Sequence, residues 1–274
     1  MSAADSGSAR GAHRTARRRA PVRLGQHFLA DSNLLEAIVR DAEVDSDDVV
    51  LEIGGGEGAL TERVAVAARH LHVIELDRGL AERLSERCAD LANVSVTHGD
   101  AMRLDLSALD PAPTAVVSNL PYSIATPVLL RTIVELGDVR RWTVMVQREI
   151  ADRLRAGPGS RTYGGPSVLV QLACEVELLR AVDRAVFTPR PRVDSALLGL
   201  TRRAAAPPGG LAALVRGAFA HRRKPLAGSL ELAGGPTRAE AHEALAAIGI
   251  RRDARAEQLA PEDFARLYER LERR

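Results

Sequence analysis

The sequence predicts an α/β fold, in which a mostly parallel, doubly wound sheet is followed by a small all-helical region. Short apolar runs alternate with helical patterns at roughly 25-residue intervals through the first two thirds of the chain, as in sheets whose parallel strands are joined by helices. Gly54, Gly56 and Gly58 directly follow one such run, where glycine lets the backbone approach a ligand closely. Beyond the stretch AAAPPGG at residues 204–210, only helical patterns remain.

Each element of the α/β part is predicted from the period of its apolar residues. Leu34, Leu35 and Ile38 follow a capping Asp31 or Ser32, which predicts the first helix. The run at residues 49–53 predicts a buried strand before the glycines. The further strands are expected at residues 71–74, 94–97, 115–118 and 142–146, and the further helices at residues 59–67, 77–88, 127–136, 149–155 and 167–173.

Two late runs, residues 175–182 and 196–200, complete a seven-stranded sheet as an antiparallel pair at its edge, joined by a Pro- and Arg-rich loop at 187–192. Helices are expected at residues 211–220, 225–232, 238–248 and 261–271. The predicted organisation is a disordered basic tail over residues 1–23, an α/β domain over 24–203, a linker over 204–210 and a helical domain over 211–274.

Composition narrows the classes of protein. Apolar residues make up 46% of the chain, enough for a sizeable core. No apolar run reaches the length of about 18 residues that a membrane span needs, and no signal-peptide pattern is present, so we expect a cytoplasmic protein without a membrane partner. Cys88 and Cys174 lie far apart and match no metal or redox spacing, so buried free thiols are expected. No cluster of metal ligands is visible, so no metal is expected.

The formal net charge of +2 conceals an asymmetry along the chain. Residues 1–30 hold 6 arginines and 1 acidic residue, residues 31–110 hold 7 basic and 18 acidic residues, and residues 111–274 hold 25 basic and 17 acidic residues. A basic start and a basic second half on either side of an acidic middle indicate a polyanionic partner. Basic segments that only keep the protein soluble are the alternative.

Three strand ends carry a candidate cofactor site. Gly54 and Gly56 follow the first predicted strand, Glu75 ends the second, and Asp100 follows the third. A carboxylate about 20 residues after the glycines is where dinucleotide-type folds hold ribose hydroxyls, and Asp100 is placed to accept from an adenine amine. The three features together predict an adenosine-containing cofactor. The glycine spacing G-x-G-x-G differs from the G-x-G-x-x-G of nicotinamide folds.

The stretch VSNLPYS, residues 117–123, follows the fourth predicted strand. Asn119 offers an amide for hydrogen bonds, Pro121 fixes the backbone, and Tyr122 offers a plane on which a flat substrate can stack. An ordinary strand-to-helix turn is the alternative reading of the same residues.

Nine motifs occur in order: GQHFL, LEIGGGEGALT, VIELD, HGDAM, NLPYSIATP, VQREIADRL, YGGPSVLVQ, FTPRPRVDSAL and AHRRKPL. Together they resemble the ribosomal-RNA adenine N6-dimethyltransferases, from about Arg23 to the C-terminus, and the small-subunit (16S rRNA, kasugamycin-sensitivity) type most. The resemblance implies a Rossmann-like class I methyltransferase domain that uses S-adenosylmethionine. It also implies dimethylation of two adjacent adenosines in the 3′-terminal hairpin loop of small-subunit rRNA, during ribosome biogenesis.

Site residues carry over from the resemblance by position. His27 and Leu29 are expected beside the methionine end of the cofactor, with Gly54 and Gly56 behind it. Glu75 is expected to hold the ribose and Asp100 the adenine, and Asn119 to lie by the transferring methyl group.

The target adenine has its own expected contacts. The Asn119 side chain and the Leu120 carbonyl are expected to accept the two amine hydrogens, and Pro121 to shape the turn. Tyr122 is expected to stack on the base, and Phe187 is a candidate for its other face or else an ordinary core residue. The expected RNA contacts are Arg17, Arg18, Arg19, Arg23, Arg190, Arg192, Arg222, Arg223 and Lys224.

The expected partner is small-subunit rRNA in a pre-30S particle, bound by a monomer. Three alternatives remain open from the sequence. One is a large-subunit (23S) rRNA methyltransferase of the macrolide-resistance type, which shares fold and site. The second is a non-catalytic rRNA-binding assembly factor, and the third, more distant, is a nicotinamide-dependent dehydrogenase.

Overall fold

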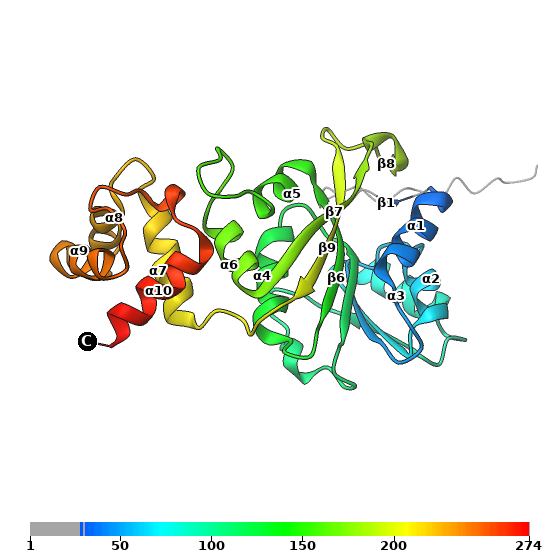
Figure 1. Cartoon of the computed structure of the whole chain (residues 1–274). Helices are drawn as coiled ribbons and strands as arrows, with labels where there is room; N and C mark the ends of the chain where they lie inside the picture. Colours follow the sequence, from blue (N-terminus) through cyan, green and yellow to red (C-terminus); the bar gives the residue numbers. More distant parts are fainter. Residues whose placement is uncertain (1–27, 30, 274) are drawn as a thin grey trace, which may run out of the picture.

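The protein forms an α/β lobe and a helical lobe (Figure 1). Its structure is a computed structural model that describes residues 28, 29 and 31–273. The large sheet contains β2 (Val49–Ile53), β3 (His70–Glu75), β4 (Val94–His98), β5 (Ala115–Asn119), β6 (Arg141–Gln147), β7 (Cys174–Val182) and β9 (Ser195–Arg202). The helices packed on this sheet are α1 (Ser32–Ala42), α2 (Thr61–Ala67), α3 (Arg78–Arg87), α4 (Ala125–Glu135), α5 (Arg148–Leu154) and α6 (Gly165–Ala173). Short 3-10 turns occur in this lobe at Leu106–Ala108 and Arg184–Val186, and in the helical lobe at Ala256–Gln258.

The strands of the large sheet lie in the order β4-β3-β2-β5-β6-β9-β7. The five strands from β4 to β6 are parallel, and β9 is antiparallel to both β6 and β7. The prediction of a mostly parallel, seven-stranded sheet with an antiparallel edge pair is confirmed. The chain moves outward from β2 to β3 and β4, then returns to β5 on the other side of β2. The ends of β2 and β5 therefore form the switch point at which such sheets bind ligands.

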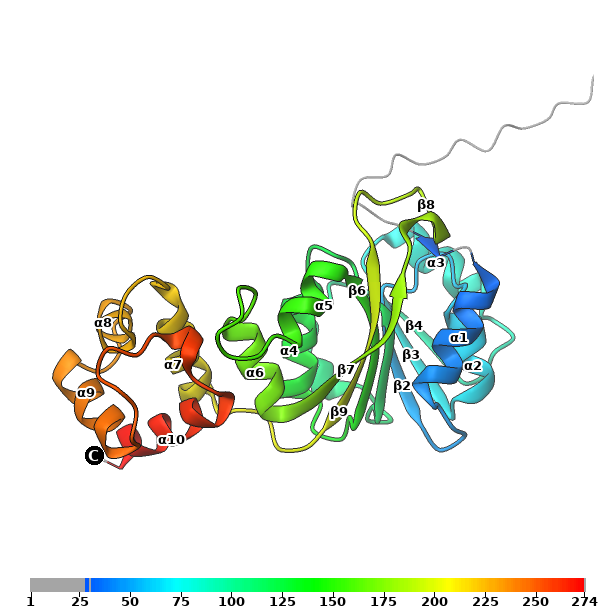
Figure 2. The same cartoon turned by 45° about the horizontal axis from the view of Figure 1, so that its top comes forward.

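Helices cover both faces of the sheet. In two views, α1, α2 and α3 lie on one face and α4, α5 and α6 on the other (Figures 1 and 2). Acidic caps set two of the helix starts: Asp31 accepts a hydrogen bond from the Leu34 amide, and Asp77 accepts one from the Leu80 amide. Each cap satisfies a backbone N–H that the first helical turn leaves unpaired.

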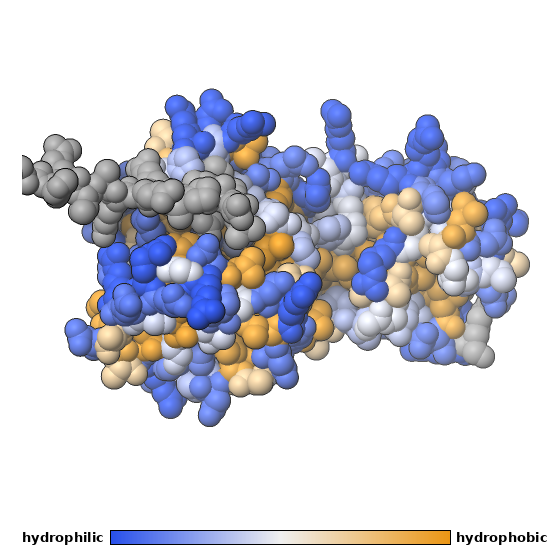
Figure 3. Space-filling model, turned by 180° about the vertical axis from the view of Figure 1, so that it is seen from behind, coloured by the Kyte–Doolittle hydropathy of each residue, from blue (hydrophilic) through white to orange (hydrophobic). Residues whose placement is uncertain are grey.

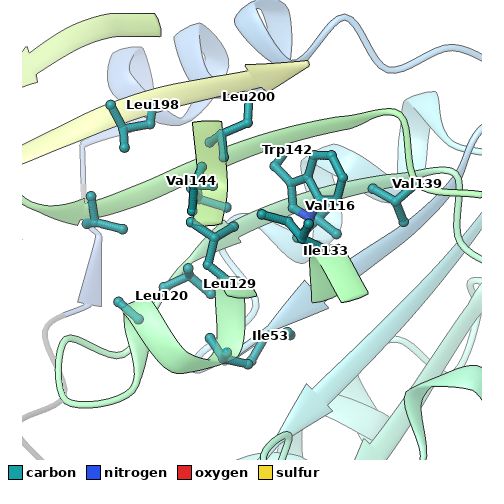
Figure 4. Packing of buried hydrophobic residues seen from close by; sticks show 14 of the residues in the cluster. Ile53, Val116, Leu120, Leu129, Ile133, Val139, Trp142, Val144, Leu198 and Leu200 are labelled. Carbon is teal, nitrogen blue, oxygen red and sulfur yellow. The ribbon is translucent and has the colours of Figure 1, made fainter. Parts of the chain in front are cut away.

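The arrangement of the core explains why the strand sequences are continuous apolar runs. Both faces of a parallel sheet are covered by helices, so successive side chains are buried whichever way they point. All five residues of β2 are buried. On the α4 face, Leu129 and Ile133 point towards Val144 and Trp142 of β6 (Figure 4). The indole N–H of Trp142 donates to Thr132 Oγ1 at 3.0 Å, so its one polar atom is satisfied.

The helical lobe consists of α7 (Gly209–Ala220), α8 (Leu226–Leu232), α9 (Arg238–Ala247) and α10 (Pro261–Glu272). It packs on the segment 156–169 of the α/β lobe through one hydrophobic cluster. Tyr163 is fully buried there and donates its hydroxyl hydrogen to the Leu259 carbonyl at 2.9 Å. The Gly159 amide donates to the Glu257 carbonyl at 2.7 Å. The two lobes are therefore joined by these contacts as well as by the connecting segment of the chain.

Two expectations about segments need correction. Phe187 does not lie in a loop: β8 (Phe187–Thr188) pairs antiparallel with β1 (Phe28–Leu29) and forms a second, two-stranded sheet. Helix α7 already begins at Gly209, after Pro208, so the irregular connection is shorter than the expected 204–210. The tail over residues 1–23 lies outside the described residues, and the division into domains stays a prediction.

Candidate active site

A cavity of about 370 Å³ opens at the carboxyl ends of β2, β3, β4 and β5. The backbone turns after these four strands form most of its wall, and β1 closes one side. The lining residues are Phe28, Leu29, Glu52, Ile53, Gly54, Gly55, Gly56, Glu57, Ala59, Leu60, Ile74, Glu75, Leu76, Gly99, Asp100, Ala101, Met102, Asn119, Leu120, Pro121, Tyr122, Ser123 and Ile124.

The glycines after β2 bring the backbone to the cavity wall. Gly54 has φ +87° and Gly56 has φ +56°, a region that side chains disfavour. A Cβ atom at Gly54 would lie 3.3 Å from Cγ of Pro121, and one at Gly56 would lie 3.3 Å from the ring of Phe28. Gly54 therefore keeps open the space towards the Asn119–Tyr122 turn, and Gly56 keeps open the space towards β1.

Glu75 joins the end of β3 to the glycine turn. Its side chain is only 4% exposed, and Oε2 accepts the Gly56 N–H at 2.9 Å while Oε1 accepts the Asp77 N–H at 2.8 Å. Each carboxylate oxygen has a further lone pair. Glu75 can therefore accept two hydroxyl hydrogens from a ligand without losing its backbone partners.

Asp100 lies on a loop that Arg131 of α4 holds. Asp100 Oδ1 accepts the Met102 N–H at 2.9 Å, and Oδ2 lies 3.5 Å from Arg103 Nε. The Arg131 guanidinium donates to the Ala101 and Leu104 carbonyls and pairs with Glu135. The loop that carries the predicted adenine contact is thus fixed to a helix of the core.

Asn119 ends β5 and begins the predicted substrate turn. The Leu120 N–H donates to the Met145 carbonyl at 3.1 Å, which continues the β5–β6 pairing by one residue. The Ile124 N–H donates to the Pro121 carbonyl at 3.1 Å and closes the turn before α4. Tyr122 is half-buried, and its hydroxyl lies 2.7 Å from Oγ of Ser195.

The structure brings together nine predicted site residues in this one cavity: Leu29, Gly54, Gly56, Glu75, Asp100, Asn119, Leu120, Pro121 and Tyr122. Phe187 is not among the residues that line the cavity, and it is 2% exposed within the core cluster around β2 and β3. Its stacking role stays a prediction. His27 lies outside the described residues.

Glu52 is a cavity residue that sequence reasoning missed. It is 1% exposed, and the Thr61 hydroxyl donates to its Oε2 at 2.7 Å. Burial raises the pKa of this carboxyl to about 8, against the opposing effect of the Thr61 hydrogen bond, and the nearby Glu75 carboxylate adds to the increase. An acidic residue inside an otherwise apolar strand was the signal that could have revealed Glu52.

The predicted RNA contacts that the structure describes are exposed. Arg190 and Arg192 lie between β8 and β9, with Arg190 3.8 Å from Asp183. Between α7 and α8, Arg222 donates to the Arg161 and Tyr163 carbonyls and pairs with Glu257, so it joins the two lobes. Arg223 and Lys224 are exposed beside it.

Seen from behind, hydrophilic side chains cover much of the surface of both lobes (Figure 3). Arg17, Arg18, Arg19 and Arg23 lie outside the described residues.

Within residues 28, 29 and 31–273, no group of three or more His, Cys, Asp or Glu side chains is placed to hold a metal ion. In the part of the chain that the structure describes, no helix combines the length and the apolar character that crossing a membrane requires. Cys88 and Cys174 are both buried free thiols, as their spacing predicted.

Comparison with known proteins decides the family. A family model described as "Ribosomal RNA adenine dimethylase" matches residues 17–273. The chain belongs to the ribosomal RNA adenine dimethylase family. Membership confirms the predicted resemblance, the predicted enzyme class and S-adenosylmethionine as the cofactor. A dehydrogenase is therefore not favoured.

Similar proteins cover nearly the whole chain. Relatives named "Ribosomal RNA small subunit methyltransferase A" include one from Rubrobacter xylanophilus, 44% identical over 251 residues (91% of this chain, 94% of the relative). Another, from Streptomyces coelicolor, is 43% identical over 256 residues (89% and 88%). Among solved structures, a dimethyladenosine transferase from Plasmodium falciparum has a TM-score of 0.76 at 26% identity (88% and 96%). The 23S rRNA methyltransferase ErmE has a TM-score of 0.65 at 30% identity (89% and 99%).

Proposed function

We propose that this enzyme dimethylates the N6 amines of two adjacent adenosines in the 3′-terminal hairpin loop of small-subunit rRNA. The observation that carries the proposal is that the Asn119–Tyr122 turn shares one cavity with Glu75 and Asp100. Relatives named as small-subunit methyltransferases reach 44% identity, compared with 30% for the solved 23S enzyme. This difference favours the small subunit over the large one.

The residues of the cavity fit S-adenosylmethionine. Glu75 retains acceptor capacity for two ribose hydroxyls, and Asp100 can accept from an adenine amine. Gly54 and Gly56 leave room where a Cβ atom would crowd Pro121 and Phe28. When bound, this cofactor supplies an activated methyl group on a sulfonium centre. Its binding positions on this chain are proposed to be Leu29, Gly54, Gly56, Glu75, Asp100 and Asn119, with His27 from the segment before β1.

The protein's contribution to catalysis is mainly orientation. The lone pair of an adenine amine is delocalised into the ring, so the amine is a weak nucleophile. Asn119 Oδ1 and the Leu120 carbonyl are placed at the end of β5, where they can accept its two hydrogens and direct the lone pair out of the ring plane. Tyr122 supplies a stacking plane, which is worth about 1–3 kcal/mol per base in other proteins. Fixed orientation of this kind supplies a large part of many rate accelerations.

Exposed basic residues support RNA as the substrate. A loop adenosine leaves its stack at little cost, because no base pair must be broken. Arg190, Arg192, Arg223 and Lys224 are exposed and available for phosphates, and the arginines before residue 24 would add further charge. We propose that a monomer acts in the cytoplasm on a pre-30S particle.

The target is tested with purified ribosomal subunits. Small and large subunits that lack adenine dimethylation are incubated with the enzyme and labelled S-adenosylmethionine. Label is expected in the rRNA of the small subunit and not of the large subunit. Label confined to the large subunit would establish the 23S alternative, and label in neither, with the RNA still bound, would support a non-catalytic assembly factor.

A further inference from the structure

The hydroxyl group of Tyr122 is held by a residue from a different part of the sheet. Ser195 lies 73 residues further along the chain, and its Oγ is 2.7 Å from the Tyr122 hydroxyl oxygen. Ser195 is 1% exposed, so its hydroxyl is shielded from solvent and needs a protein partner. Tyr122 itself lies on the turn between β5 and α4, outside the regular strands and helices.

Ser195 lies on a strand that is paired on both sides. It is the first residue of β9, where it pairs with Gln147 of β6 on one side and Val182 of β7 on the other. The Asp194 carbonyl just before it accepts the Arg148 N–H at 2.9 Å. A side chain on a strand keeps its position better than one on a loop. The hydrogen bond to Ser195 thus links the Tyr122 ring to this strand.

The position of the Tyr122 ring matters because the ring lines the cavity beside the proposed acceptors for the target base. Tyr122 lines the cavity together with Asn119 and Leu120, which are the proposed acceptors for the amine of the target base. If the ring is already oriented, less side-chain freedom is lost when a base stacks on it. Burial raises the pKa of Tyr122, so the phenol keeps its proton at neutral pH and remains able to donate.

We propose that Ser195 is a positioning residue for the target adenine, acting through its hydrogen bond to the Tyr122 hydroxyl. The inference rests on the proposed function, because it takes the base that Tyr122 contacts to be the methylated adenine. Ser195 does not touch the substrate. It acts by presenting the Tyr122 ring at the angle that the Asn119 and Leu120 acceptors require.

A double-mutant cycle tests the proposal on the full-length enzyme. Ser195→Ala and Tyr122→Phe each remove one partner of the hydrogen bond and leave the ring in place. Each is expected to raise the KM for RNA about three- to tenfold, as for loss of one hydrogen bond of about 0.5–1.5 kcal/mol. The double variant is expected to show no further increase. The KM for S-adenosylmethionine should not change in any of the three.

Two further variants separate positioning from structural support. Ser167→Ala is the matched control: Ser167 is equally buried, but its hydroxyl donates to the Arg153 carbonyl in α5. It is expected to lower thermal stability without changing the KM for RNA. Ser195→Thr keeps the hydroxyl and should restore the wild-type KM. If Ser195→Ala does not fold, Tyr122→Phe and Ser195→Thr carry the test.

Two results would overturn the proposal. One is that Ser195→Ala or Tyr122→Phe has the same KM for RNA as the wild-type enzyme. The other is that the increases in KM of the two single variants multiply in the double variant. A failure of the proposed function is a separate result. If the wild-type enzyme methylates the large subunit instead, the cycle is run on that substrate, and the role of Ser195 is judged there.

Discussion

The hydroxyl of Thr61 donates a hydrogen bond to Glu52 Oε2 at 2.7 Å, beneath the glycine turn of the cavity. Thr61 is the first residue of α2 and Glu52 is the fourth of β2, so this bond ties the strand to the helix across the turn. Both side chains are buried. The bond fixes both ends of the glycine turn that lines the cavity.

Glu52 predicts a pH dependence of stability. Burial raises its pKa from an ordinary 4.5 to about 8, so between these values the folded protein holds a proton that the unfolded chain releases. The free energy of unfolding should therefore fall as pH rises through this window, by up to about 1.4 kcal/mol per pH unit. The Glu52→Gln variant has no carboxyl that titrates at this position, so its free energy of unfolding should not show this decrease.

Urea denaturation of the two proteins at several pH values measures the effect. The stability of wild type relative to Glu52→Gln is expected to be greatest near the lower end of the window and smallest near the upper end. Glu86→Gln, which changes an exposed carboxyl on α3, should follow wild type at every pH. Curves for wild type and Glu52→Gln that stay parallel would show that Glu52 is ionised in the folded protein.

Glu75→Gln should weaken cofactor binding about 10- to 100-fold, the loss of roughly 1.5–3 kcal/mol expected for hydrogen bonds to a charged group. The amide nitrogen of Gln would also face a backbone N–H that the carboxylate now accepts. Titration calorimetry with S-adenosylmethionine measures the change. Glu82→Gln serves as the control, since Glu82 only pairs with Arg78 on the exposed side of α3. Unchanged affinity in Glu75→Gln would remove Glu75 from the proposed site.

Arg131→Met should loosen the loop that carries Asp100. The substitution leaves the Ala101 and Leu104 carbonyls without their guanidinium partner, at a cost of about 1–3 kcal/mol in stability. We expect a lower Tm, faster amide exchange at residues 99–104 and a cofactor Kd raised about three- to tenfold. Arg140→Met changes an exposed arginine and should alter none of these. If exchange in the loop is unaffected, Arg131 does not hold it.

Arg223 and Lys224 should contribute to RNA binding through charge alone. Replacing both with alanine is expected to weaken binding and to reduce the slope of log affinity against log salt by about one for each phosphate that is no longer neutralised. Arg222→Ala should instead lower stability, because Arg222 joins the lobes through the Arg161 and Tyr163 carbonyls. Binding isotherms at several salt concentrations distinguish the two. An unchanged slope in the Arg223 and Lys224 variant would place the RNA elsewhere.

Most of the fold could be predicted because its elements are local and strongly patterned. The helix expected at residues 77–88 is α3 (Arg78–Arg87), since Asp77 caps it and Leu80 and Leu84 set its buried side. The strand ends that carry Gly54, Glu75, Asp100 and Asn119 meet in one cavity because parallel strands share a carboxyl edge.

What the sequence did not reveal depends on contacts between distant segments. The pairing of Phe28 with Thr188 joins two-residue strands, which are too short to show any period. The approach of Ser195 to Tyr122 depends on β9 lying beside β6, and no local pattern reports it. The shift of the Glu52 pKa needs the full enclosure of its carboxyl by the folded core.

The most direct test of the account is mass mapping of dimethyladenosine in rRNA from cells that carry either the wild-type enzyme or Asn119→Ala. With wild type, two adjacent N6,N6-dimethyladenosines are expected in the 3′-terminal hairpin loop of small-subunit rRNA. With Asn119→Ala they should be absent, although the purified variant still binds the RNA. Dimethyladenosines that persist in the Asn119→Ala cells, or that appear only in large-subunit rRNA, would contradict the account.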